Sequence, residues 1–356
     1  MSVRVNKSSF NIREKLSELE RPIGLKGSEL MKSETVQEAR DLVSAGRKNL
    51  IINGELQIWQ RGSSISAAYS TRPYTADMFR IYNVSSGSGA TFSRDTDVPS
   101  EEFAYSLKRD TNGYNGYSEI NLPVELNQPG SYSPFVPGET YTFSYWAKSD
   151  STWVNICTGR WSTAVTSGTS VSSKLIKGHS GGGGWEKVIH QFTMDTDPGS
   201  ATFFSILVGR NNSHVGVNYF TGFQLERGKN ATEFEHRSYG EELALCQRYF
   251  EVVFSNTGYV NTCLIGKAIS TDQALFAFPW KVEKRAAPTT AITGTGILYY
   301  RLLTTTSYTI GNFDNGTIGG RFTLNSISGS PLTAGEALHF DLNSTPPFVM
   351  TVSAEL

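Results

Sequence analysis

VNYFTGFQLERGKNATEFEHRSYGEELALCQRYF, residues 217–250, is the stretch that decides the fold of this chain. Every second residue of its first part falls on one side of an extended chain: Val217, Tyr219, Thr221, Phe223 and Leu225. This period of two predicts a β-strand with one buried face. A turn-forming run of Arg, Gly, Lys and Asn at residues 227–230 ends the predicted strand.

A helix is predicted to follow the strand. Ser238 and Glu241 stand at the spacing of a capping box, in which the two side chains satisfy free backbone donors of the first turn. Leu243, Cys246 and Phe250 would form the apolar stripe of this helix. One β-sandwich therefore ends here, and the helix leads the chain into a second β region.

Length and composition are typical of two β-rich domains. The chain has 356 residues, 38% of them hydrophobic and 12% aromatic, with 34 glycines that suit short strands joined by tight turns. Lys and Arg number 32 against 33 Asp and Glu, a net charge of −1 that excludes a general attraction to nucleic acid or to an anionic membrane surface.

Targeting segments and disulfides are not expected. No run of about 18 apolar residues exists that would predict a membrane span, and the first residues lack the apolar core of a signal peptide. Cys157, Cys246 and Cys263 are scattered and odd in number, as in a protein that folds in a reducing cytosol.

Residues 1–48 differ from the rest of the chain and predict two short helices. The stripes of these helices are thin, and they contain Ile12, Leu16, Leu19, Val36 and Leu42. Helices of this size bury too little area to be stable alone. We expect them to dock on copies of themselves or on another protein; the alternative is a frayed leader.

The remainder is predicted to be mainly β. Residues 49–237 form a jelly-roll-like antiparallel sandwich, and residues 238–356 form the linking helix and a second, C-terminal β-sandwich. The first is expected to open with a strand from residue 49 that enters a turn at Asn53-Gly54 and continues over 56–60. Further strands are expected at 103–110, 141–148, 153–158, 186–194 and 202–209. The second contains predicted strands at 250–254, 259–269, 274–279, 296–305, 320–326 and 348–355, with a strand-entry or edge segment at 284–289.

Searches for catalytic motifs give no positive result. The sequence contains no GxSxG, HExxH, CxxC or GxxxxGK[ST] pattern, and its five histidines lack the spacing of metal ligands. We therefore expect a protein that is not an enzyme, with glycan hydrolysis as the residual alternative. No cofactor is expected, although Glu55 and Glu226 could contribute to a Ca²⁺ site in the sandwich.

Aromatic residues beside polar loop residues are the better functional signal, since a flat ring can stack on a sugar while its neighbours bind hydroxyl groups. The candidates are Asn112, Tyr114, Asn115, Tyr117, Trp153, Arg160 and Trp161. Trp153 could equally lie in the core or at its rim, and the turn at Tyr114–Tyr117 could be exposed only by chance. Trp59 and Trp146 are interpreted as core residues.

Several segments together resemble a family of bacteriophage tail-fibre and receptor-binding proteins with a jelly-roll domain like a carbohydrate-binding module. The similar segments are 49–54, 59–62, 74–77, 141–148, 222–226, 231–235, 237–249, 285–289 and 353–356. The run RSYGEELALCQRY at 237–249 is the most specific of them. Glu233 and Met78 depart from the family, which often has proline and arginine there.

The resemblance implies a virion protein made in the host cytoplasm, typically a homotrimeric fibre or spike. Residues 1–48 would attach it to the phage tail or capsid, and the β domains would meet a host surface polysaccharide, without nucleic-acid binding or membrane insertion. Two alternatives remain open: a structural fibre or decoration protein without its own receptor site, and a polysaccharide depolymerase.

The assignment of residues 1–48 to attachment can be tested by deleting them. We expect residues 49–356 to remain a folded, soluble trimer that no longer joins particles, because the anchor and the β domains are separate units. Circular dichroism, light scattering and incorporation into particles measure these properties. Unfolding of the shortened chain would contradict the assignment.

Overall fold

The computed structural model describes residues 48–68, 71–83, 89–113, 118–126, 134–150, 158–164, 167–170, 179–194, 203–211, 215–255, 263–294, 296–300, 303–305, 308–328, 332–342 and 349–355. The chain divides into two compact units, residues 1–49 and 50–356, and every described strand and helix belongs to the second unit. The helices predicted before residue 48 lie outside the described residues, as does most of the strand predicted at 153–158.

Two antiparallel sheets form the first sandwich. The six-stranded sheet has the order β1 (Ser64–Ser66), β3 (Thr91–Asp95), β4 (Ser106–Asp110), β11 (Val217–Arg227), β6 (Thr140–Lys148) and β9 (Trp185–Thr193). The five-stranded sheet has the order β2 (Arg80–Asn83), β5 (Ser118–Glu125), β10 (Phe203–Asn211), β7 (Thr158–Ala164) and β8 (Ser167–Ser170). One hydrophobic cluster takes buried side chains from both sheets, among them Tyr141, Phe143, Tyr145, Phe204 and Ile206. The predicted mainly-β architecture is confirmed.

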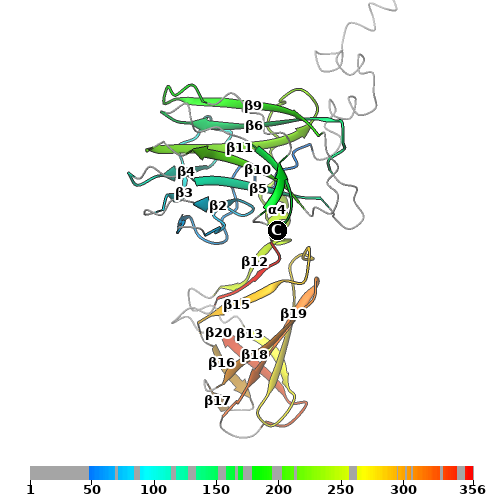
Figure 1. Ribbon diagram of the computed structural model, residues 1–356. Helices are drawn as coiled ribbons and strands as arrows, with labels where there is room; N and C mark the ends of the chain where they lie inside the picture. The colour runs from blue at the N-terminus through cyan, green and yellow to red at the C-terminus, as the bar shows by residue number, and fades with distance from the viewer. Residues whose placement is uncertain are drawn as a thin grey trace, which may run out of the picture. The chain divides into compact units, whose positions relative to one another are not determined.

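The chain continues through helix α4 (Tyr239–Gln247) into two further antiparallel sheets (Figure 1). The smaller sheet has the order β12 (Phe250–Ser255), β21 (Val349–Ser353) and β15 (Thr289–Thr293). The larger has the order β17 (Leu303–Thr305), β16 (Gly296–Tyr300), β20 (Ala337–Leu342), β13 (Cys263–Ala268), β14 (Ala274–Pro279), β19 (Gly319–Asn325) and β18 (Thr309–Asn315). A second hydrophobic cluster, including Phe276, Phe322, Phe340, Met350 and Val352, draws on both sheets.

Two details of this part bear on the sequence prediction. The single strand expected at 296–305 is instead a hairpin of β16 and β17, because Tyr300 and Leu303 pair with each other. The segment at 284–289, predicted as a strand entry or an edge, leads into β15, which is an edge strand of its sheet. The domain limits at residues 48 and 237 stay predictions.

Strand β11 departs from the strict alternation that its sequence suggests. Its register against β6 shifts between Thr221 and Gln224, and Gly222 has a φ of +63°. Such a bulge adds one residue and reverses the phase of the side chains beyond it. Phe220 and Phe223 therefore both lie in the core, although the alternation placed them on opposite sides.

Glycine is required at the bulge for reasons of space as well as conformation. A Cβ atom on Gly222 would lie 2.9 Å from the ring of Phe103 and 3.0 Å from that of Trp146. Trp146, interpreted from the sequence as a core residue, is partly exposed and follows buried Tyr145, so it belongs to the face of β6 that points away from the core. The bulge thus lets an aromatic layer pack on the outer face.

The strands predicted at 49–52 and 56–60 are wrong, whereas the turn predicted at Asn53-Gly54 is present. These residues form compact turns in which Asn53 and Leu56 have φ values of 60° and 61°. The Asn53 side chain holds the turns together, since its amide donates to the carbonyls of Ile58 and Asp77 at 2.9 Å and accepts from the Ile58 N–H at 3.0 Å. A side chain that forms hydrogen bonds with nearby backbone groups in this way favours a turn over pairing with a neighbouring β-strand.

Helix α4 begins as predicted, with Ser238 as its cap accepting from the Glu241 N–H at 3.3 Å. The predicted stripe is only partly right. Cys246 is buried in the first core, but Phe250 begins β12 and is not helical. Glu242 is also buried, where it accepts hydrogen bonds from the Asn53 N–H and from Arg237.

A buried ion-pair network joins the first sandwich to the end of the chain. The Arg61 guanidinium bonds to Asp77 at 3.1 Å and to Glu355, and it lies 3.5 Å from the centroid of the Phe250 ring. Burial raises the pKa of Asp77 to about 6 and that of Glu355 to about 7, although the charge of Arg61 opposes both shifts. The cost of burying two carboxylates is thus only partly offset by one cation.

Substitution at the bulge should be far more damaging than at an ordinary turn glycine. We expect Gly222→Ala to lower the free energy of unfolding by about 2 to 4 kcal/mol, because backbone strain adds to overpacking against Phe103 and Trp146. Gly113→Ala is the control: its φ is +80°, but no atom lies within 4 Å, so only the strain of about 1 kcal/mol applies. Equal losses in chemical denaturation would contradict this account.

The Glu355 carboxyl should make stability depend on pH. Its pKa rises from an ordinary 4.5 to about 7 on folding, so its stabilising protonated form is complete below pH 4.5 and is lost as pH rises through 7. We expect the unfolding free energy of Glu355→Gln, relative to the natural protein, to increase by about 2 to 3 kcal/mol between pH 5 and pH 8. Urea denaturation at the two pH values measures it, and a constant difference would refute the buried, protonatable carboxyl.

Candidate functional site

Six residues form a continuous row across the six-stranded sheet, one from each strand. Cross-strand pairing joins them in the succession Ser64, Ser93, Lys108, Tyr219, Lys148 and Trp185. Residues directly opposite in antiparallel strands point to the same face. We call this set the outer row. Figure 1 shows β3, β4, β11, β6 and β9 as neighbouring ribbons in this succession.

The pleat of each strand keeps the outer row on the face away from the core. In β4, β11 and β6 the residues next to the row are buried core residues: Leu107, Phe220 and Ala147. Lys108, Tyr219, Lys148 and Trp185 are all partly exposed. The sheet therefore presents two aromatic rings and two ammonium groups in one line toward solvent.

The rings and ammonium groups of the outer row lie close together. The ring centroids of Tyr219 and Trp185 are 6.3 Å apart, with 53° between their planes. The ammonium nitrogen of Lys148 lies 5.4 Å from the Tyr219 centroid, and that of Lys108 lies 6.0 Å away. Both lysines are thus within the range of a cation–π interaction with one tyrosine.

Asp97 fixes one end of the outer row. Its carboxylate accepts from the Lys148 ammonium at 2.6 Å and from the Trp185 indole N–H at 2.9 Å. Partial burial acts to raise the pKa of Asp97, but the hydrogen bonds from Lys148 and Trp185 and the charge of Lys148 outweigh it and lower the pKa. Asp97 is itself held by a turn, since its N–H donates to the Asp95 side chain at 3.0 Å. The indole and the Lys148 ammonium are therefore oriented before any ligand arrives.

The glycine-rich turn before β9 positions Trp185. The Gly183 N–H donates to the Ser149 carbonyl at 2.9 Å, which ties the turn to the end of β6. The ring of buried His179 spans the turn, accepting from the Gly181 N–H at 2.9 Å and lying 2.7 Å from the Gly184 carbonyl. Hydrogen bonds therefore hold the turn from which Trp185 begins β9.

The part of the outer face beyond Trp146 is covered by the segment that follows β11. The Lys187 ammonium donates to the Thr232 carbonyl at 3.1 Å, and the rings of Phe103 and Phe234 are 5.2 Å apart in an edge-to-face arrangement. The Gln224 side chain accepts from the Glu235 N–H at 2.8 Å. This cover borders the outer row on one side.

The two carboxylates considered for a Ca²⁺ site have other partners. Glu226 is buried and accepts from the Thr232 N–H at 2.9 Å and from its hydroxyl at 2.7 Å. Glu55 lies 3.2 Å from the ring nitrogen Nδ1 of His236. Within the described ranges, no three His, Cys, Asp or Glu residues gather as metal ligands would.

The residues predicted from the sequence as a binding site are not brought together where they can be followed. Tyr114, Asn115, Tyr117 and Trp153 lie outside the described residues, as do the proposed attachment residues Ile12, Leu16, Leu19, Val36 and Leu42. Arg160 and Trp161 belong to β7 in the five-stranded sheet, where they pair with Ser205 and Phe204.

Asn112, in contrast, follows β4 in the six-stranded sheet. It has a φ of 52°, and its side-chain amide donates to the Gly89 carbonyl and to the Thr91 hydroxyl, both at 3.0 Å. Both bonds hold the turn that it occupies against the neighbouring strand. Asn112 therefore acts as a turn former.

Sequence reasoning missed the outer row for two reasons. The alternation grouped Tyr219 with Phe223, because the bulge between them could not be seen. Asp97 lies 88 positions before Trp185 in the sequence, so nothing local joins them. The available signal was the pattern of β6, where Tyr141, Phe143 and Tyr145 alternate with smaller residues and Trp146 and Lys148 fall on the polar side.

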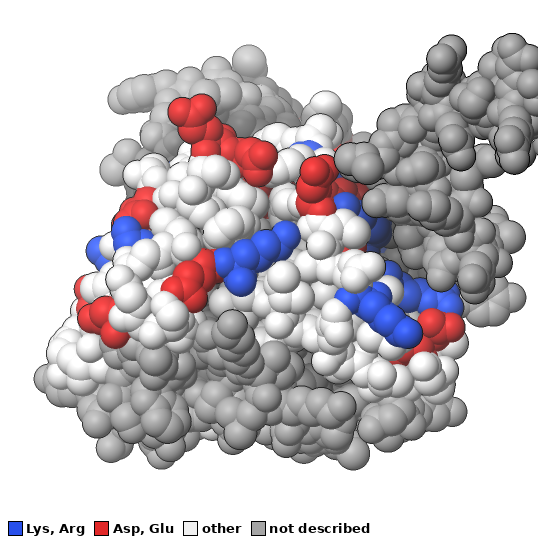
Figure 2. Space-filling view, turned by 90° about the horizontal axis from the view of Figure 1, so that it is seen from above, with Lys and Arg blue, Asp and Glu red and all other residues white. Residues whose placement is uncertain are grey.

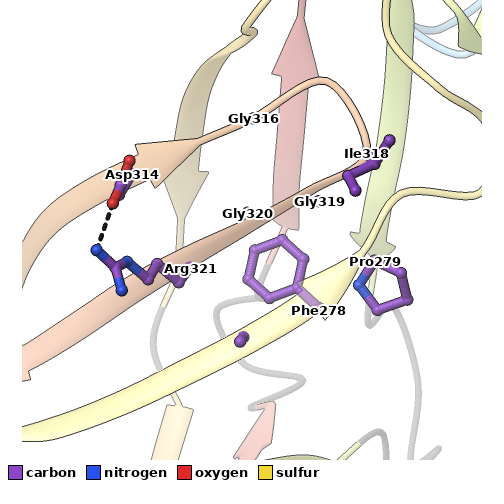
Figure 3. A pocket seen from close by; sticks show the side chains of 9 residues that line it. Phe278, Pro279, Asp314, Gly316, Ile318, Gly319, Gly320 and Arg321 are labelled. Atoms are coloured by element: carbon purple, nitrogen blue, oxygen red, sulfur yellow. Dashed lines mark hydrogen bonds and ion pairs between the residues drawn. The ribbon is translucent and has the colours of Figure 1, made fainter.

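A shallow pocket of about 530 Å³ on the seven-stranded sheet is a weaker candidate (Figure 3). Phe278, Pro279 and the 73% exposed Ile318 provide its apolar side chains. Its charged groups, Arg321 and Asp314, bond to each other at 2.5 Å. The pocket offers apolar contact, and its two charges neutralise each other.

The charge on the surface is mixed. On the face that Figure 2 shows, Lys and Arg side chains lie in small groups among Asp and Glu, surrounded by uncharged residues. This agrees with the net charge of −1 and with the interspersed charges of the sequence. Among the described helices, none is long and apolar enough to cross a membrane.

Comparison with known proteins gives structural likenesses only. No family model and no curated protein matches the chain. The enzymatically active domain of tailspike protein 4 of bacteriophage CBA120 matches with a TM-score of 0.35 and 14% identity, over 51% of this chain and 21% of that chain. A CBM4 structure matches with a TM-score of 0.32 and 14% identity, over 50% and 99% of the two chains.

A Stig cyclase from Fischerella sp. TAU matches with a TM-score of 0.30 and 8% identity, over 52% of this chain and 98% of that chain. The chain thus spans about a fifth of the tailspike domain that it resembles, and nearly all of the two smaller proteins. Because these TM-scores lie below 0.5, any functional conclusion rests on the geometry of the outer row.

Proposed function

We propose that this protein is a non-enzymatic phage tail fibre or receptor-binding protein that holds a host surface glycan on the outer row. The observation that supports the proposal is the line of Lys108, Tyr219, Lys148 and Trp185 across four adjacent strands. Sugars present apolar C–H faces and hydroxyl groups, and aromatic rings beside charged groups can bind both. In this proposal the first sandwich is a jelly roll that carries the glycan site.

Tyr219 and Trp185 are the stacking groups of the proposed site. Both side chains are partly exposed, so a sugar ring can reach them without rearrangement of the core. The planes of the two rings are 53° apart. This angle suits two successive sugar rings that are turned relative to each other better than two sugar rings that lie in one plane. A chain of sugars would then follow the row across the strands.

Lys148 and Asp97 are the polar groups beside the stacking pair. Their 2.6 Å ion pair is already formed, so neither side chain has to be ordered by the glycan. Each retains capacity for a sugar hydroxyl: an ammonium has three donors, and a carboxylate has about four acceptor positions. Preorganisation lowers the entropic cost of binding.

Attachment and valency complete the proposal. Residues 1–48 attach the protein to the particle, and three copies form a fibre whose sheets are tethered together. Linked sites gain affinity from their effective concentration without any new contact. A shallow, partly exposed row that binds one sugar chain weakly is therefore sufficient for adsorption.

Removal of the stacking rings tests the proposal. We expect Trp185→Ala and Tyr219→Ala each to weaken binding to host cells or to extracted host glycan by about tenfold or more, a loss of about 1.4 kcal/mol or more. Tyr239→Ala is the matched control, because Tyr239 is 59% exposed at the start of α4 and is not in the row. Fluorescence-labelled protein on cells measures the binding, and thermal unfolding checks the fold.

The two alternatives give different results in the same experiments. A structural fibre or decoration protein would bind no host fraction, and row substitutions would leave adsorption unchanged. A depolymerase would release new reducing ends from host polysaccharide during incubation. Either result would overturn the proposed function.

A further inference from the structure

We infer that the outer row selects an anionic glycan, one whose sugar carries a carboxylate or sulfate, and that Lys108 binds this anion. The inference rests on the proposed function and adds the class of ligand. It starts from a difference between the two lysines that flank Tyr219. Lys148 has a carboxylate partner, Asp97 at 2.6 Å, whereas no described carboxylate lies within 4.0 Å of the Lys108 ammonium.

Among the described residues immediately around the Tyr219 ring, ammonium groups outnumber carboxylates. Two lysines and Asp97 give +2 − 1 = +1 around one tyrosine ring. Asp95 and Asp110 lie two positions along their strands from row residues and accept from the N–H groups of Asp97 at 3.0 Å and Asn112 at 2.8 Å, and neither forms an ion pair within 4.0 Å of the Lys108 ammonium. Lys108 is left as the cation that an incoming anion would meet.

The place of Lys108 in the row suits a charged sugar. It stands opposite Tyr219 on the side away from Trp185, so an anionic group on a sugar stacked at Tyr219 can reach it. From β4 to β9 the row crosses three strand spacings, about 14 Å, which is room for a short run of sugar rings. The neutral end of such a run would lie over Trp185, and its charged end over Lys108.

The surroundings of Lys108 make the contact stronger than one at an open surface. The residue is only partly exposed, and its ammonium lies 6.0 Å from the Tyr219 centroid, so the tyrosine ring borders it on one side. A charge-assisted hydrogen bond in such a place exceeds the small value of an exposed ion pair. It should also weaken as salt rises, because the site remains open to solvent.

Matched polymers test the inference on the full chain. The probes are polygalacturonate with its carboxyl-reduced neutral form, and dextran sulfate with neutral dextran. We expect the charged member of at least one pair to bind tenfold or more tightly than its neutral partner, and Lys108→Gln to remove most of that difference. The pair that shows the preference identifies the anion as carboxylate or sulfate.

A control lysine separates a built site from general attraction. Lys267 is exposed on β13 in the seven-stranded sheet, so Lys267→Gln changes the net charge equally and should leave binding unchanged. An equal effect of the two lysine substitutions would overturn the inference. So would equal binding within both pairs, or no binding to either charged polymer.

Failure of the inference and failure of the proposed function are distinguishable. If Trp185→Ala still abolishes adsorption to host cells while charged and neutral polymers bind alike, the glycan role stands and the anion preference does not. If Trp185→Ala leaves both adsorption and polymer binding unchanged, the row is not the site, and both proposals fall together.

Discussion

The register of β11 between its two neighbours is the constraint on which the rest of the site depends. Tyr219 is paired with Lys108 on one side and with Lys148 on the other, and Trp185 follows by the pairing of β6 with β9. Because the side chains of a strand alternate, a slip of one residue would turn Tyr219 inward and Phe220 outward. The buried Phe220 opposes such a slip, so the same apolar contact that stabilises the core also aligns the binding face.

The bulge at Gly222 divides this strand into two parts with different tasks. Before it, Val217 and Tyr219 on the outward side are partly exposed and Thr221 is already buried; beyond it both faces are buried, with Phe223 in the core and Gln224 under the covering segment. A regular strand would have placed Phe223 under that cover and a polar residue in the core. The local backbone conformation of one glycine therefore decides which residues of β11 beyond Thr221 face the core.

Much of the fold was predictable, because long, regular patterns carry their own register. The strand expected at 274–279 matches β14, and the strand expected at 141–148 matches β6 to within one residue. The turn at Asn53-Gly54 was predicted, but the residues on either side of it were mistaken for strands, since Asn53 holds them through a side chain that bonds to Asp77, distant in sequence. A segment held by strand pairing and a segment held by side-chain hydrogen bonds can have similar apolar patterns in the sequence. Only the tertiary contacts distinguish the two.

The site was less predictable than the fold. It takes one residue from each of several strands and a loop carboxylate, Asp97, that reaches Lys148 and Trp185 from 51 and 88 positions away. The spacing of residues within one segment of the sequence does not indicate such an arrangement. The loop aromatics singled out from the sequence have the right chemistry for sugars, but the structure supplies that chemistry on a sheet face, where the pleat and register hold the rings in a fixed relation.

The indole N–H resonance of Trp185 in a two-dimensional NMR spectrum, recorded during titration with host polysaccharide, tests the central claim most directly. The Trp185 resonance is assigned as the one that disappears from the spectrum of Trp185→Phe. The indole N–H of Trp280 donates to the Gly316 carbonyl in the second core, and its resonance is the internal reference. The account predicts that the Trp185 resonance shifts with saturating ligand while that of Trp280 stays in place. Polysaccharide that binds the protein and leaves the Trp185 resonance unmoved would contradict it.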